Sequence, residues 1–153
     1  MRALSLHQPW ASCVVHGFKK IETRGWRTKH RGLLAIHAAK AWDREKRETL
    51  DHFLRLFPEL SVIEPVPRGG IVGVVDVVGC EPMTEAWIKT QSRRELKLGT
   101  YELDRYGWAL ENPRRVEPMI PLNGQRILFS LDQAVVEMIK TRLQCGVIGG
   151  AGP

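Results

Sequence analysis

Basic and aromatic side chains are mixed together in the first 40 residues of the chain. This segment holds eight Lys and Arg residues and a single acid, Glu22, whereas the remaining residues are close to neutral overall. Three of the five tryptophans lie in it or directly beside it: Trp10, Trp26 and Trp42. Cations neutralise phosphates and aromatic rings stack on bases, so this combination suits single-stranded nucleic acid. A solvated basic face without a nucleic-acid partner is the alternative interpretation.

Four side chains of this segment have the chemistry needed to recognise a base. Trp26 is the best candidate for an exposed stacking platform, whereas the core is the favoured place for Trp10. Gln8 could hydrogen-bond to a base edge. Glu22 has cations on both sides in the sequence, so it would pair with them, accept from an exocyclic amine, or act as a general base.

Several common kinds of enzyme site are missing from the sequence. The five histidines lack metalloprotease spacing and no Cys/His set has zinc-finger spacing, so we expect neither a metal nor another cofactor. No serine lies in a G-x-S-x-G elbow, and no glycine pair leads into a P-loop. Three cysteines without a C-x-x-C pair favour a reducing cytoplasm. The longest apolar run, residues 71–78, is too short for a membrane helix, and we expect no membrane association and no signal peptide.

The elements that must position these side chains are short and of both kinds. Pro9 can open a helix and Pro58 can end one, while alternating or β-branched runs indicate strands. Asp76, inside an apolar run, would pair with Arg2 or Arg24 or face a cleft. We expect strands at residues 3–6, 19–24, 33–38, 71–78, 106–110 and 126–131 and helices at residues 9–17, 41–57, 84–96 and 132–143.

The remaining segments are expected to be loops within one domain. Loops are predicted at residues 27–31 and 60–70, a turn at residues 111–115, and a mobile polar stretch at residues 91–105. Mixed strands and short helices around one sheet predict an α+β fold. We therefore expect a single domain over residues 1–145 and a flexible tail over residues 146–153.

Five motifs, in order along the chain, resemble the ASCH domain family. They are LSLHQPWA (residues 4–11), GFKKIETRGW (17–26), HRGLLAIHAAK (30–40), GGIVGVVDVVGC (69–80) and YGWALENPRR (106–115) followed by PMIPLNG (118–124). Together they cover about residues 2–132. The resemblance implies a PUA-like fold, a small mixed β-barrel flanked by short helices, with a cleft for RNA or single nucleosides.

The resemblance also implies which residues surround that cleft. In the family a G-x-K-x-x-E-x-R turn forms the centre of the site, and it corresponds here to Gly17, Lys19, Glu22 and Arg24. The basic segment itself adds Lys20 and Trp26. The other residues that the resemblance places around the cleft are Gln8, Trp10, His37, Lys40, Tyr106 and Trp108.

The resemblance implies more than one function. Some members are RNA-binding modules, small bacterial members are amidohydrolases acting on N4-acylcytidine, and another is associated with RNA cleavage. The hydrolases carry a Thr nucleophile three residues after the Lys. Here Glu22 holds that position after Lys19, and only a shift of one residue, to Lys20 and Thr23, restores the spacing.

The sequence therefore favours a module that binds RNA, another single-stranded nucleic acid or a modified nucleoside in a basic cleft. The alternative is an amidohydrolase removing acyl groups from N4-acylcytidine-type nucleosides, with Lys19 and Glu22 as candidate catalytic residues. A hydrolase would also use a distant Glu, for which the candidates are Glu81, Glu85 and Glu95. A protein-interaction module is a third possibility, which an exposed apolar patch would indicate.

Overall fold

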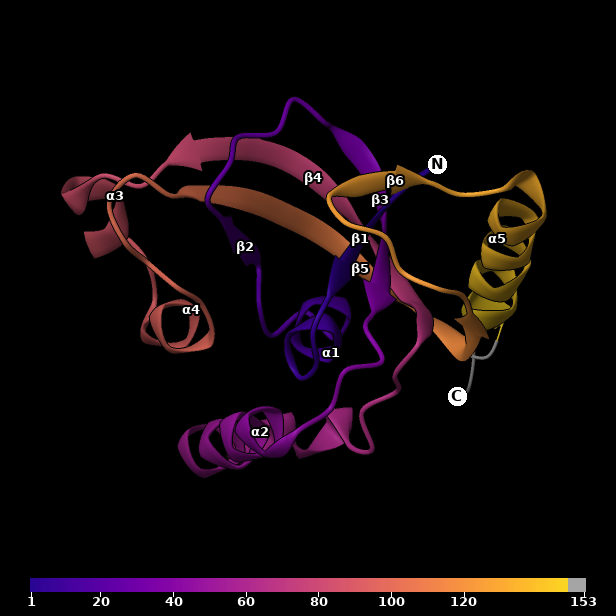
Figure 1. Ribbon diagram of the computed structural model, residues 1–153, viewed down its shortest axis with the longest axis horizontal. Helices are drawn as coiled ribbons and strands as arrows, with labels where there is room; N and C mark the ends of the chain where they lie inside the picture. The colour runs from indigo at the N-terminus through magenta and orange to yellow at the C-terminus, as the bar shows by residue number, and fades with distance from the viewer. Residues whose placement is uncertain (149–153) are drawn as a thin grey trace.

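Six strands form one mixed sheet that curls into a half-barrel, seen as the arched ribbon in Figure 1. The computed structural model describes residues 1–148. The strand order is β2-β5-β4-β3-β1-β6, with β1 and β3 parallel and the other neighbours antiparallel. The strands are β1 (Arg2–Leu6), β2 (Ile21–Arg24), β3 (Gly32–Ala38), β4 (Gly70–Pro82), β5 (Tyr106–Pro121) and β6 (Leu128–Ser130). This arrangement confirms the expected α+β fold.

The long strands β4 and β5 carry the curl of the sheet. The β-branched run of β4 is buried and central, as its composition predicts. Three register shifts interrupt its pairing with β5, and each such irregularity bends and twists a strand. The turn expected at residues 111–115 is wrong, because these residues continue β5. Asn112 lies at one of these register shifts. Its backbone is in the left-handed conformation, with φ 52°, which Asn tolerates well.

Helices cover the concave side and both ends of the sheet (Figure 1). The buried helix α1 lies against β3, β4 and β5, while α5 packs on β5. Leu34, Ile36, Val75 and Trp108 are among the residues that form the largest core cluster with α1. The helices are α1 (Trp10–Val15), α2 (Arg44–Leu56), the 3₁₀ helix η1 (Pro58–Ile63), α3 (Glu85–Lys89), α4 (Arg93–Leu98) and α5 (Gln133–Ile148).

The polar stretch at residues 91–105 is not the mobile region that its composition suggests. The helix expected over residues 84–96 is two helices, because Thr84 caps α3 and Ser92 caps α4 through their side chains. In α4 the side chains of Glu95 and Leu98 are buried. This segment is therefore folded onto the body of the protein.

Other boundaries differ in smaller ways. Helix α2 begins at Arg44 because the Asp43 side chain accepts from the Lys46 N–H and caps it. Residues 60–63 of the loop expected at residues 60–70 belong to η1, in which Leu60 and Ile63 are buried. Asp76 does pair with a cation, but with Arg114, at 3.7 Å.

The chain end differs as well from the expected tail at residues 146–153. Residues 146–148 continue α5, and residues 149–153 lie outside the described residues. None of the described helices has the length and apolar character needed to cross a bilayer.

Candidate functional site

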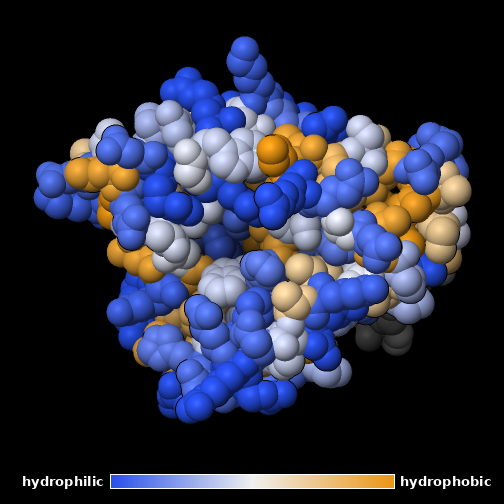
Figure 2. Space-filling model, in the orientation of Figure 1, coloured by the Kyte–Doolittle hydropathy of each residue, from blue (hydrophilic) through white to orange (hydrophobic). Residues whose placement is uncertain are grey.

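A cavity of about 570 Å³ opens on the concave side of the sheet. It is lined by the end of β1, the start of α1, β2 with the two residues after it, two residues of α2, and residues 97–100 with Arg105. Figure 2 shows a hollow near the middle of this face, with hydrophilic residues inside it. Segments far apart in the chain therefore meet around one polar cavity.

Lys19, Glu22 and Arg24 form an ion-pair cluster in the wall of this cavity. Glu22 Oε2 lies 3.7 Å from Lys19 Nζ, and Glu22 Oε1 lies 3.0 Å from Arg24 Nε. The second contact is an ion pair only, because Arg24 Nε is not aligned for a hydrogen bond. The Lys19 and Glu22 side chains are 2% and 9% exposed, so two cations and one carboxylate share a nearly dry corner. Both carboxylate oxygens of Glu22 therefore face a positive charge.

Local backbone geometry brings these three side chains together. Gly17 ends α1 with φ 81°, a conformation that favours glycine, and the next two N–H groups return to the Cys13 carbonyl. This turn directs Lys19 inward, where its Nζ donates to the Ile21 carbonyl. Glu22 and Arg24 are two apart in β2, so they project from the same face of the strand.

The segment after α4 forms the opposite wall. The Thr100 N–H donates to Thr23 Oγ1 at 3.2 Å, and Arg105 Nη2 donates to the Thr23 carbonyl at 3.1 Å. A Cβ on Gly99 would lie 3.1 Å from the Thr23 side chain, so the close approach of this segment to β2 favours glycine. Lys97 and Arg105 add two further cations to the lining.

Two tryptophans flank the polar cluster. Trp10 packs edge-on against Phe53 of α2, with ring centroids 6.1 Å apart. Trp26 packs edge-on against Trp108, with centroids 4.7 Å apart, and the Trp108 indole N–H donates to the Trp26 carbonyl. Both rings are partly exposed and both line the cavity. Each is held by an aromatic neighbour, so it can offer a fixed surface.

A second polar group lies behind the cavity wall. Glu95 is buried and accepts from the Lys20 backbone N–H at 2.6 Å and from the Tyr101 hydroxyl at 3.4 Å. Burial, and after it the Glu95 charge, raises the pKa of the Tyr101 hydroxyl. Of the three glutamates considered as a distant catalytic group, Glu81 and Glu85 are exposed and only Glu95 is buried near the cluster. Glu95 does not line the cavity, so its role here is to hold α4 to the residue before β2.

Comparison with known sequences identifies the family to which this chain belongs. The model of the ASCH domain family matches residues 4–120. The chain belongs to the ASCH domain family. Activating signal cointegrator 1 of Homo sapiens and that of Mus musculus are each 31% identical to it over 144 residues, which is 92% of this chain and 24% of each relative. This ASCH chain thus spans about a quarter of the length of these curated relatives.

Solved ASCH proteins of Zymomonas mobilis share the fold. One has a TM-score of 0.55 at 14% identity and covers 92% of this chain and 93% of that one. A serine-to-alanine mutant of that protein has a TM-score of 0.54 at 14% identity, with coverages of 92% and 94%. Likeness at this identity concerns the fold alone. The resemblance implies a small mixed β-barrel flanked by short helices, and the sheet observed is a half-barrel with short helices.

Three of the residues expected around the ASCH cleft do not reach the cavity. Gln8 is fully buried, and its amide is used by Ser12 and by the Pro67 carbonyl, so it is not free to read a base. Trp108 is fully buried behind Trp26 and supports that ring instead of lining the cavity. Lys20 lines a different cavity, so the shifted pair of Lys20 and Thr23 does not share one site.

Two more of the expected residues, His37 and Lys40, line a separate cavity of about 460 Å³. Tyr106, considered as a wall, lies under the Arg27 guanidinium, 5.4 Å from ring centroid to Cζ, and does not line the main cavity. The structure thus brings together six of the expected residues, which are Trp10, Lys19, Glu22, Thr23, Arg24 and Trp26.

The residues that sequence reasoning missed come from α2, from the end of α4 and from the polar residues after it. Lys97, Thr100 and Arg105 belong to the segment expected to be mobile, and the basic character of Lys97 and Arg105 was the only available signal. Phe53, in the helix expected over residues 41–57, packs against Trp10. Within residues 1–148, no group of three or more His, Cys, Asp or Glu side chains is arranged to hold a metal ion.

Proposed function

We propose that this ASCH domain binds RNA or a modified nucleoside in the cavity around Lys19, Glu22 and Arg24. The observation that carries the proposal is a nearly dry carboxylate, fixed between two cations, in a cavity flanked by two partly exposed tryptophans. The cavity volume of about 570 Å³ is within the range of small-ligand sites. A flat, polar ligand with a π-face and hydrogen-bonding edges matches these walls.

Each wall has a separate part in this proposal. Trp26 and Trp10 offer faces or edges against which a base can stack. Glu22 can only accept hydrogen bonds, so it favours a base with an exocyclic amine, such as cytosine. Lys97 and Arg105, nearer the solvent, neutralise phosphate, which positions the chain without reading its sequence.

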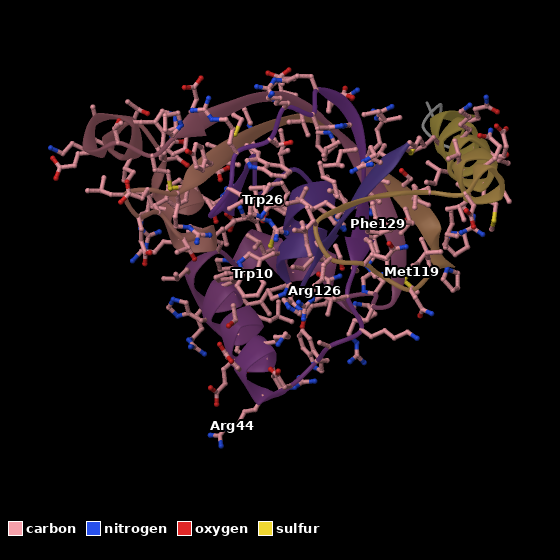
Figure 3. The ribbon with its side chains drawn as sticks, turned by 45° about the horizontal axis from the view of Figure 1, so that its top comes forward. Trp10, Trp26, Arg44, Met119, Arg126 and Phe129 are labelled. Carbon is pink, nitrogen blue, oxygen red and sulfur yellow. The ribbon has the colours of Figure 1, made fainter. Side chains whose placement is uncertain are left out.

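Fluorescence anisotropy with a fluorescein-labelled octacytidylate RNA tests the proposal. We expect binding that weakens steeply with NaCl, with a slope of about 0.7 per neutralised phosphate in a plot of log K against log salt. Arg24→Ala should weaken binding about tenfold, because it removes a cation that faces both Glu22 and the cavity. Arg44→Ala is the matched control, since Arg44 is exposed at the far end of α2 (Figure 3). Absence of salt-dependent binding, or equal effects of the two variants, would contradict the proposal.

A second candidate function is hydrolysis of an N4-acylated cytidine in the same cavity. The pairing of Lys19 with Glu22 in the cavity wall favours it, because a carboxylate can take a proton from water while an ammonium stabilises the oxyanion on the attacked carbonyl. Water adds to that carbonyl, the C–N bond breaks, and the amine leaves with the proton. Binding is the better supported function, since both Glu22 oxygens already face cations.

Cytidine release from N4-acetylcytidine distinguishes the two functions. The variant is Lys19→Met, which keeps an aliphatic stem in the buried position and removes the charge. Turnover by the wild type that is lost in this variant would establish the hydrolase. No turnover, together with salt-sensitive RNA binding, is the result expected for a binding module.

A further inference from the structure

The second cavity, lined by His37 and Lys40, adjoins the main one. Ser5 lines both cavities, and its carbonyl and hydroxyl oxygen atoms make contacts in the walls of different cavities. The Ser5 carbonyl accepts from Arg24 Nη2 at 3.2 Å, in the wall of the main cavity. The Ser5 hydroxyl lies 2.9 Å from His37 Nδ1, in the wall of the second cavity. One residue of β1 therefore separates the two spaces.

The charged side chains that line the second cavity are both basic. Its lining includes the cations Lys40 and Arg126, both exposed, and among the described residues that line it there is no carboxylate. Its other polar side chains are those of Ser5, His37, Asn123 and Gln125. In Figure 3, Arg126 lies toward the middle of the view, in the same region as Trp10 and Trp26. A basic second cavity beside the first is a surface suited to a chain of phosphates.

The loop that carries Arg126 is held in place by His37. The His37 Nε2 lies 2.6 Å from the Leu122 carbonyl oxygen. Because a carbonyl oxygen can only accept a hydrogen bond, Nε2 carries the proton. In the neutral ring Nδ1 is then left to accept from the Ser5 hydroxyl. A Cβ on Gly124 would lie 2.7 Å from the His37 ring, so the loop passes directly over the imidazole. His37 is thus a positioning residue for the second cavity.

We propose that the second cavity binds the nucleotide next to the one in the main cavity, with Lys40 and Arg126 contacting its phosphate. This inference rests on the proposed function and makes it more specific: the ligand is a single-stranded oligonucleotide that crosses Ser5. A free nucleoside would occupy the main cavity and leave the second one unused. The backbone of the oligonucleotide runs from the Trp26 side toward the loop at residues 122–126.

Isothermal titration calorimetry with cytidine 5′-monophosphate and with tetracytidylate RNA tests the inference. We expect the tetranucleotide to bind at least tenfold more tightly than the mononucleotide. The double variant Lys40→Ala/Arg126→Ala should remove this gain and leave mononucleotide affinity within about twofold of the wild type. It should also lower the salt slope for the tetranucleotide by about 0.7, because the two side chains together neutralise one phosphate of a single strand.

The matched control is Lys89→Ala/Lys140→Ala, which removes the same charge from exposed positions of α3 and α5. It should leave the gain from the tetranucleotide intact, because neither residue lines a cavity described above. If both double variants lose the tetranucleotide gain equally, the gain depends only on the net charge of the protein, and the inference is overturned. Mononucleotide binding without any gain from the longer ligand would overturn it while the proposed function stands. If neither ligand binds, the proposed function fails as well.

Discussion

At the scale of single residues, the candidate site depends on Glu22. It is the only carboxylate in the first 40 residues, and in the structure it joins Lys19 and Arg24 into one cluster. The sequence could predict this group, because its members lie within six residues of one another. It could not predict that the Gln8 side chain is buried. A side-chain amide can hydrogen-bond equally well to the edge of a base and to the backbone at the start of a helix.

Replacing Glu22 by Gln should destabilise the protein. The change leaves the buried Lys19 ammonium with the Ile21 carbonyl as its main partner, and we expect the free energy of unfolding to fall by about 2 kcal/mol. Urea denaturation at pH 7.5 measures the effect. Glu48→Gln is the control, because Glu48 pairs with Arg44 in solvent, and it should cost less than about 0.5 kcal/mol. Equal losses would show that the buried cluster contributes no more than a surface ion pair.

Cys13 should resist alkylation although two other thiols react. It is fully buried in α1, and burial raises the pKa of its thiol to about 12, so almost no thiolate forms at pH 8. Cys145 is exposed and Cys80 is partly exposed. Treatment of the native protein with iodoacetamide, followed by peptide mass mapping, should find label on Cys145 first and none on Cys13. Label on Cys13 under native conditions would mean that α1 opens readily.

At the scale of elements, the strongest local patterns gave the correct structure. The β-branched run of β4 and the Pro9 start of α1 could both be recognised, because each depends on neighbouring residues only. The turn predicted at residues 111–115 was wrong, since long-range pairing with β4 overrides a local Asn-Pro signal. The folding of residues 91–105 was missed for the same reason. Its buried contacts are made with residues far away in the sequence.

The packing of α1 inside the curl predicts a steric effect at Gly73. A Cβ there would lie 2.5 Å from the Val15 side chain and 2.6 Å from the Arg114 carbonyl, so Gly73→Ala should force α1 and β5 away from β4. We expect a loss of about 2 kcal/mol. Thermal unfolding followed by circular dichroism provides the measurement. Gly79→Ala, whose new methyl would meet its nearest neighbour at 3.7 Å, should unfold close to the wild type.

At the scale of the whole molecule, the cavity is assembled from β1, α1, β2, α2, the end of α4 and the segment after α4. The contiguous part, from Trp10 to Trp26, could be predicted from the sequence. The rest could not, because residues 97–105 reach the site through tertiary contacts, such as the hydrogen bonds of Thr100 and Arg105 to Thr23. The same limit explains why His37 and Lys40 were expected in one cleft with Lys19, although they line a second cavity.

Global stability should fall as the pH drops from 7.5 to 5.5. Burial lowers the pKa of the His37 and His16 imidazoles from an ordinary value of about 6.5. Near that value the unfolded chain takes up protons that the folded chain does not, so the unfolding free energy decreases with decreasing pH. His37→Gln should reduce this dependence in urea titrations at pH 7.5, 6.5 and 5.5. An unchanged slope would show that His37 is protonated equally in both states.

An open half-barrel, unlike a closed one, leaves two free sheet margins, and such margins invite pairing with strands of other molecules. One margin is β2. There the Arg105 guanidinium donates to the Thr23 carbonyl, and the Thr100 N–H donates to the Thr23 hydroxyl oxygen. The other is β6, which is only three residues long. The segment that walls the cavity thus also shields one margin from intermolecular strand addition. Loss of that segment would expose the domain to aggregation as well as open one wall of the cavity.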